Sequence, residues 1–129
     1  MSVRREDFGP MPDGRLVERF VLEGNGLSAA VISYGAALQS LFAPGRDGTL
    51  DDVVLGGDTI DAYLDERRFF GAVVGRYANR IHKGYADASG AFVDLPQNDG
   101  QNCLHGGPAG FDTHAVSYTH LRAHETPEH

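Results

Sequence analysis

The chain has 129 residues, of which 41% are hydrophobic and 22% charged, as is typical of one soluble globular domain with its own core. Its formal charge of −7 disfavours a nucleic-acid partner, which needs a basic surface. No apolar run approaches the roughly 20 residues that span a bilayer, and the basic N-terminus lacks the apolar stretch of a secretory signal. The single cysteine, Cys103, excludes an internal disulfide. We therefore expect a cytoplasmic protein without a membrane or nucleic-acid partner.

Apolar alternation and turn signals predict short strands in the first half of the chain. Residues 15–22 alternate at period two and lead into Glu23-Gly24-Asn25-Gly26, which is typical of a hairpin turn. The residues of 44–48 are also typical of a turn. The predicted strands cover residues 15–22, 27–32, 37–42 and 52–55.

Residues 59–66 are the one helical candidate, with Thr59 as the expected cap. The apolar face of this helix comprises Ile60, Tyr63 and Leu64. A further hairpin is expected within 85–95, around Ser89-Gly90. Short strands with turn signals every 8–12 residues or so predict an all-β chain, in which antiparallel strands form a sandwich or a barrel.

His105 is the most informative residue of the chain. It lies in the segment 98–112, which is too rich in Gly, Asn and Asp for the interior of a strand or a helix. Gly106 and Gly107 follow it, so a ligand or another stretch of backbone can approach it closely. A titratable group on such a loop is a candidate site residue, and a turn that happens to hold a histidine is the alternative.

A second candidate site lies in the polar segment 75–84, where Asn79 stands beside Arg80. Arginine presents a planar fork of donors, and asparagine presents both a donor and an acceptor. Adjacent Asn and Arg side chains can therefore bind neighbouring hydroxyl groups of a polyol. In the alternative interpretation, Arg80 pairs with an acidic neighbour and Asn79 makes a turn.

The last residues of the chain differ from the rest in their sequence pattern. Apolar alternation stops at about Val116, and we expect residues 116–129 to be a non-native or disordered tail, beyond a domain at 1–115. His120 and His124 have the spacing of a zinc-binding pair on a helix, but they lack a glutamate directly after the first histidine, and Pro127 follows. No metal site is predicted there.

Together these segments resemble the aldose 1-epimerase (galactose mutarotase) family. The resemblance is collinear over about residues 8–112, and it is carried by GRYANRI at 75–81 and by N…LHGG…GFD at 98–112. It implies an antiparallel β-sandwich, of which this chain is the incomplete N-terminal part. It also implies an isomerase that interconverts the α and β anomers of free aldoses such as galactose and glucose, without a metal or organic cofactor.

The resemblance assigns roles to three residues. Asn79 and Arg80 match the family's sugar-binding pair, and His105 matches the first of its two active-site histidines, which contacts the sugar near the ring oxygen. Gly106 and Gly107 are then expected to leave room for the sugar ring.

The family's other functional residues have no counterpart here. Its second histidine, its sugar-binding aspartate and its glutamate base lie beyond the GFD element, so we expect the 129-residue chain itself to be inactive. Two alternatives stay open. One is a non-catalytic carbohydrate-binding module of the same fold. The other is a hexose-6-phosphate 1-epimerase, which would need cationic contacts that the sequence does not reveal.

Overall fold

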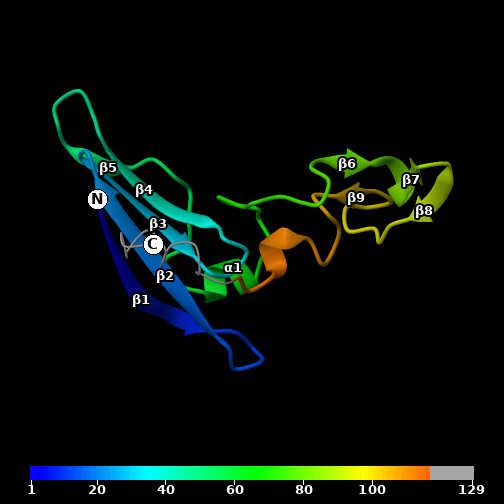
Figure 1. Ribbon diagram of the computed structural model, residues 1–129, viewed down its shortest axis with the longest axis horizontal. Helices are drawn as coiled ribbons and strands as arrows, with labels where there is room; N and C mark the ends of the chain where they lie inside the picture. The colour runs from blue at the N-terminus through cyan, green and yellow to red at the C-terminus, as the bar shows by residue number, and fades with distance from the viewer. Residues whose placement is uncertain (117–129) are drawn as a thin grey trace, which may run out of the picture. The chain divides into compact units, whose positions relative to one another are not determined.

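The structure, a computed structural model, describes residues 1–116. The chain forms two compact units (Figure 1). Within the described residues, the first comprises Met1–Ala72 with Ala115 and Val116, and the second comprises Val73–His114. No helix within the described residues is long and apolar enough to cross a membrane.

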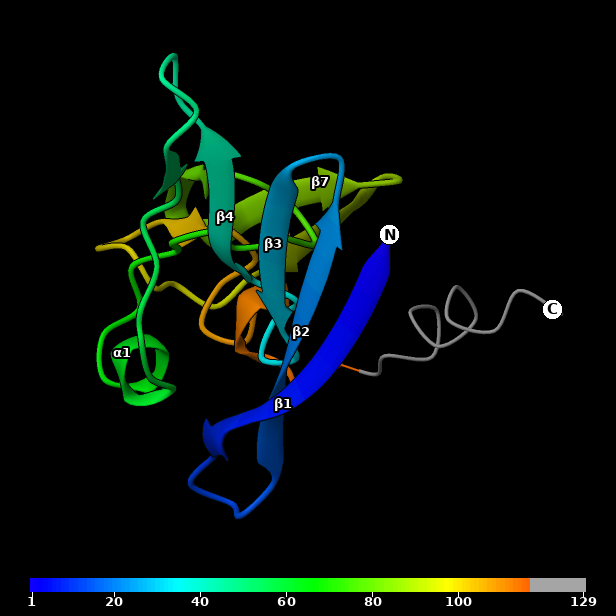
Figure 2. The ribbon, with the colours of Figure 1, turned by 90° about the vertical axis from the view of Figure 1, so that its left-hand side faces the viewer.

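The first unit is built on a five-stranded sheet in the order β1-β2-β3-β4-β5, in which every neighbouring pair is antiparallel (Figure 2). The strands are β1 (Ser2–Pro10), β2 (Leu16–Gly24), β3 (Leu27–Ile32), β4 (Leu38–Pro44) and β5 (Leu50–Asp52). Such a meander needs only short connections between sequential strands. The predicted antiparallel, mostly β architecture is therefore confirmed for this unit.

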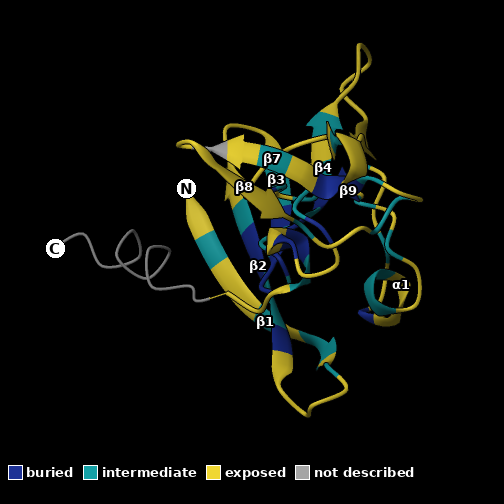
Figure 3. Cartoon of the chain, turned by 90° about the vertical axis from the view of Figure 1, so that its right-hand side faces the viewer, coloured by how far each residue is buried: buried dark blue, intermediate teal, exposed yellow. Residues whose placement is uncertain are grey.

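The turn between β2 and β3 is the predicted one. Asn25 and Gly26 both have positive φ angles, of 53° and 78°, as a two-residue hairpin loop requires. Buried residues of the first unit pack into one core, and Figure 3 colours the buried residues of the chain dark blue, for example on β2. That core comprises Val17, Ile32, Ala37 and Ile60, with Phe8, Met11, Tyr34, Tyr63 and Leu64 packed against it.

Two predicted elements are corrected in position or length. The strand expected at 52–55 is β5, which ends at Asp52. The carboxylate of Asp52 accepts the backbone N–H of Val54 (3.1 Å), and this local turn competes with the ladder. The predicted helix at 59–66 is only α1 (Asp61–Leu64), and its cap is Ile60 rather than Thr59. The backbone carbonyl of Thr59, not its side chain, accepts the N–H of Ala62 (3.2 Å).

The second unit has little regular structure. Strands β6 (Arg80–Ile81) and β9 (Cys103–Leu104) pair with each other, and β7 (Tyr85–Ala88) pairs with β8 (Ala91–Asp94). Two short 3₁₀ turns complete it, at His82–Gly84 and Phe111–Thr113. The β7–β8 hairpin is the one predicted, since Ser89 and Gly90 form its tip with φ angles of 55° and 80°.

Candidate sugar site

The pairing of β6 with β9 brings the three predicted site residues together. Arg80 lies opposite Leu104 in this antiparallel pair, so Asn79, just before β6, meets His105, just after β9. The segment around His105 was expected to hold no strand, and this is wrong for Cys103 and Leu104. Two residues are enough for the ladder because both strands are anchored by further hydrogen bonds at their ends.

Two hydrogen bonds join Asn79 to His105. The backbone N–H of Asn79 donates to Nδ1 of the His105 ring (2.9 Å), and the backbone N–H of His105 donates to the carbonyl of Asn79 (3.0 Å). Because Nδ1 accepts a hydrogen bond, the proton of the neutral imidazole resides on Nε2. The ring is therefore set to act as a hydrogen-bond donor through Nε2.

Both residues adopt left-handed backbone conformations. The φ angle is 69° at Asn79 and 50° at His105. Asn and His tolerate this region better than most residues, but a cost of about 1–2 kcal/mol each is expected relative to right-handed backbone. Such conformations concentrate at functional sites, where surrounding contacts hold them in place. Here the paired hydrogen bonds between the two residues supply those contacts.

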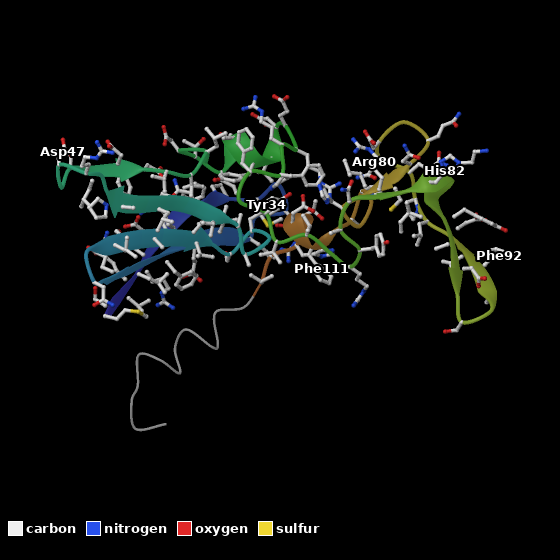
Figure 4. All side chains as sticks on the ribbon, turned by 90° about the horizontal axis from the view of Figure 1, so that it is seen from above. Tyr34, Asp47, Arg80, His82, Phe92 and Phe111 are labelled. Carbon is white, nitrogen blue, oxygen red and sulfur yellow. The ribbon has the colours of Figure 1, made fainter. Side chains whose placement is uncertain are left out.

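Arg80 forms the ion pair that the sequence left as an alternative. Its Nε donates to Oδ2 of Asp99 (2.6 Å), while the Asn79 side-chain carbonyl accepts the backbone N–H of Arg80 (2.9 Å). The Arg80 side chain is 57% exposed, and it is labelled in Figure 4. The guanidinium has five N–H donors, so those on its two Nη atoms remain after the bond to Asp99. The ion pair and a ligand contact are thus compatible.

The two glycines after His105 lie close to other stretches of the protein's backbone. A Cβ on Gly106 would lie 1.8 Å from the carbonyl oxygen of Gly75, and the φ angle of Gly106 is +91°. A Cβ on Gly107 would lie 3.3 Å from the carbonyl oxygen of Pro96. Their lack of a side chain allows two stretches of backbone to meet, and the expectation that they also make room for a sugar ring stays a prediction.

The turn that supports the site was not predicted from the sequence. Residues Asn98 to Asn102 form a tight turn closed by bonds between Asp99 and Asn102, with N···O distances of 3.1 and 2.9 Å. From this turn, Asn98 bonds the backbone of Leu104, and Asp99 bonds Arg80. Its composition, Asn-Asp-Gly-Gln-Asn, is a turn signal, but the partners of the side chains are distant in sequence.

A cavity of about 370 Å³ lies elsewhere in the second unit. Its wall is mainly apolar and includes Ile81, Leu95, Cys103 and the ring of Phe111. The guanidinium carbon of Arg76 lies 5.4 Å from the centre of that ring, in a cation–π arrangement (Phe111 is labelled in Figure 4). Asn79, Arg80 and His105 do not line this cavity. A polyol needs polar partners for its hydroxyls, so this mainly apolar wall does not suit a sugar, and the three polar residues remain the candidates.

Within residues 1–116, no three His, Cys, Asp or Glu side chains are grouped closely enough to hold a metal ion. The histidines considered for zinc, His120 and His124, lie outside the described residues, as does the predicted tail apart from Val116.

Comparison with known proteins defines the class of this chain. Residues 18–125 match the family model described as aldose 1-epimerase. The chain belongs to this family of isomerases, as its motifs predicted.

Individual relatives agree with this assignment. The chain is 45% identical over 113 residues to galactose mutarotase of Bos taurus and 39% identical over 102 residues to aldose 1-epimerase of Escherichia coli K12. These matches cover 87% and 78% of this chain, and 33% and 30% of the relatives. A crystal structure of galactose 1-epimerase from Lactobacillus acidophilus NCFM is similar with a TM-score of 0.71 and 30% identity, over 88% of this chain and 32% of that one. The chain therefore spans about a third of the length of these relatives.

Proposed function

We propose that this chain carries the first part of the sugar site of an aldose 1-epimerase and that its ligand is a neutral aldose such as galactose or glucose. The observation that carries the proposal is the Asn79–Arg80–His105 cluster, in which donors and an acceptor from two separate motifs meet across the β6–β9 pair. Family membership supports the same ligand class, since two of the relatives are named galactose mutarotase and galactose 1-epimerase, and a third is named aldose 1-epimerase.

In the proposed reaction, His105 contacts the sugar near its ring oxygen. Mutarotation needs a base that removes the proton of the anomeric hydroxyl and an acid that protonates the ring oxygen. The ring then opens, the C1–C2 bond rotates and the ring closes on the other face. A donor at Nε2 of His105 stabilises negative charge that develops on the ring oxygen as the C1–O bond breaks. Arg80 and Asn79 hold the neighbouring hydroxyls.

The charge at the cluster favours a neutral sugar over a sugar phosphate. A phosphate-binding site needs cationic donors whose charge is available to the ligand. The positive charge of Arg80 is instead paired with Asp99 at 2.6 Å. For this reason we prefer a free aldose to the hexose 6-phosphate considered from the sequence.

We further propose that the 129-residue chain does not catalyse mutarotation by itself. The family's second histidine and its glutamate base lie beyond the segment that these motifs match. Removal of a general acid or base typically slows a reaction by about 10²–10⁴-fold for each group. We also propose a cytoplasmic location, on the ground that the single cysteine cannot form an internal disulfide.

Polarimetry and ligand binding test these proposals separately. Freshly dissolved α-galactose is followed with and without the purified chain, and no acceleration above buffer is expected. Saturation-transfer NMR is expected to detect binding of galactose in the millimolar range, with loss of binding in Arg80→Ala. Acceleration well above buffer would contradict the proposed inactivity, and equal binding by Arg80→Ala would contradict the proposed site. Binding without catalysis in a family-length protein would favour the non-catalytic module.

A further inference from the structure

The side chain of Asn98 makes two hydrogen bonds that have no part in the proposed sugar contacts. Its side-chain Nδ2 donates to the carbonyl of Leu104 (2.9 Å), and its Oδ1 accepts the backbone N–H of the same residue (2.7 Å). One amide thus bonds both backbone groups of the residue directly before His105, and the Leu104 carbonyl also accepts the N–H of Gly107 (3.0 Å). The side chain is partly buried, where unpaired backbone groups are costly.

The direction of these bonds follows from the pairing of β9. Successive residues of a strand present their N–H and C=O groups to opposite edges. His105 presents its N–H toward Asn79, on the β6 side. Leu104 therefore presents its backbone groups to the other edge, where a sheet would supply a further strand. The amide of Asn98 takes the place of that strand.

We infer that Asn98 is a positioning residue for His105. With β6 on one edge and the Asn98 amide on the other, the two-residue strand β9 is bonded on both sides. His105 leaves that strand in a left-handed conformation, with a φ angle of 50°, which its surroundings must maintain. Asn98 holds the backbone from which the imidazole projects, so that Nδ1 stays on the Asn79 N–H and the neutral ring keeps its proton on Nε2. This role rests on the proposed sugar site and adds a residue to it.

Asn102 offers a matched control in the same turn. Its side-chain carbonyl accepts the backbone N–H of Lys83 (3.2 Å) and does not bond Leu104. Asn98→Ala and Asn102→Ala therefore remove the same side chain from two positions of one turn, with different partners. Asn98→Asp is a second, nearly isosteric variant: its ionised carboxylate still accepts from Leu104 N–H but can no longer donate to the Leu104 carbonyl.

The test uses the full 129-residue chain and three readouts: hydrogen exchange of the His105 amide, the ¹⁵N signals of the His105 ring, and galactose affinity by NMR. Asn98→Ala is expected to accelerate exchange of the His105 amide and to weaken galactose binding by about tenfold each, as the loss of a pair of hydrogen bonds predicts. The ¹⁵N chemical shift of His105 Nδ1 is expected to move away from the value of a hydrogen-bonded nitrogen. Asn98→Asp is expected to change the same signals in the same direction, because it sets a carboxylate oxygen against the Leu104 carbonyl, and Asn102→Ala is expected to match the wild type.

The ring signals separate positioning from a general loss of stability. A purely structural role would lower the unfolding temperature and accelerate amide exchange throughout the second unit, with unchanged His105 ring signals before unfolding. That result, or equal values for Asn98→Ala and Asn102→Ala, would overturn the inference. If the wild type bound no galactose, the proposed function would fail, and the ring signals and amide exchange would still decide the role of Asn98.

Discussion

The backbone N–H of Asn79 donates to Nδ1 of His105 across 2.9 Å, which links the two sequence motifs of the chain through a main-chain group. A side-chain donor in that place could rotate or be replaced, whereas a main-chain N–H is held by the backbone and is present with almost any residue at the position. The bond therefore determines which nitrogen of the neutral ring carries the proton.

The first prediction concerns that tautomer. In the neutral ring of His105 the proton is expected on Nε2, because Nδ1 is occupied as an acceptor. Long-range ¹H–¹⁵N correlation spectra distinguish the two tautomers directly. A neutral ring protonated on Nδ1 would contradict the geometry and remove the proposed donor to the sugar. His82 is exposed and serves as an internal reference in the same spectra.

The second prediction concerns the selectivity for neutral sugars. Asp99→Asn keeps a side-chain acceptor beside Arg80 but removes the negative charge, so the affinity for galactose 6-phosphate should rise relative to galactose. A change of roughly two- to fivefold is expected for exposed charges. The side chains of Arg80 and Asp99 are 57% and 36% exposed.

Asp94→Asn is the matched control for this measurement. Asp94 is exposed on β8, and its replacement changes the net charge by the same amount. Equal ratios of the two affinities in both variants would show that only the total charge matters, and that the Arg80–Asp99 pair does not select the ligand.

The third prediction concerns Gly106. Gly106→Ala should lower the free energy of unfolding by at least about 3 kcal/mol, since overpacking typically costs 1–3 kcal/mol and here meets rigid backbone. The new Cβ would lie 1.8 Å from the carbonyl oxygen of Gly75. Gly100→Ala is the control that measures the cost of the backbone conformation without a steric contact. Gly100 also has a positive φ angle (58°), but no atom lies within 4 Å of an added Cβ. That control should cost about 1–2 kcal/mol. Chemical denaturation of both variants measures the difference, and equal losses would contradict the close approach.

The fourth prediction concerns pH and Tyr63, which packs against the core of the first unit. Burial raises the pKa of the Tyr63 hydroxyl, although the hydrogen bond from Gly57 N–H (3.0 Å) acts in the opposite direction. The folded chain therefore holds this proton more tightly than the unfolded chain does. The resulting stability is complete below the unfolded pKa of about 10 and is lost as the pH rises through the folded pKa.

Tyr63→Phe tests this linkage. It should lower stability by about 1 kcal/mol at neutral pH, because the Gly57 N–H loses its partner, and it should flatten the decline of stability above pH 10 or so. Tyr77→Phe alters an exposed tyrosine and serves as the control. Thermal unfolding from pH 8 to 11 measures both, and parallel curves for wild type and Tyr63→Phe would contradict the prediction.

The elements that could be predicted from the sequence are those with a local signature. The hairpins at Asn25-Gly26 and Ser89-Gly90 were predicted because such residue pairs favour the positive φ angles that the turns require. Strand β3, at Leu27–Ile32, was placed correctly between a turn and a glycine.

Strand β1 was not predicted, because its stability depends on distant partners. Its charged residues hide any apolar alternation, but Arg4 pairs with Glu23 (2.9 Å) and Arg5 with Glu18 (3.3 Å) across to β2. Cross-strand pairs of this kind stabilise a sheet and leave no local pattern.

The site was predictable only in part for the same reason. The residue types and their order identified Asn79, Arg80 and His105, but not the turn that supports them. The contacts of Asn98 with Leu104 and of Asp99 with Arg80 depend on the pairing of β6 with β9. Two strands of two residues each leave too little periodicity to be recognised.

A residue-resolved galactose titration tests most directly whether Asn79, Arg80 and His105 bind the sugar. The assigned ¹H–¹⁵N spectrum of the chain is recorded at increasing galactose concentration, with an equally concentrated non-sugar polyol as the control. Galactose binding at the proposed site predicts saturable shifts that are largest at the amides of Asn79, Arg80 and His105 and at the His105 ring, and that are absent in Arg80→Ala. Saturable shifts confined to the apolar cavity around Phe111, or no galactose-specific shifts at all, would contradict it.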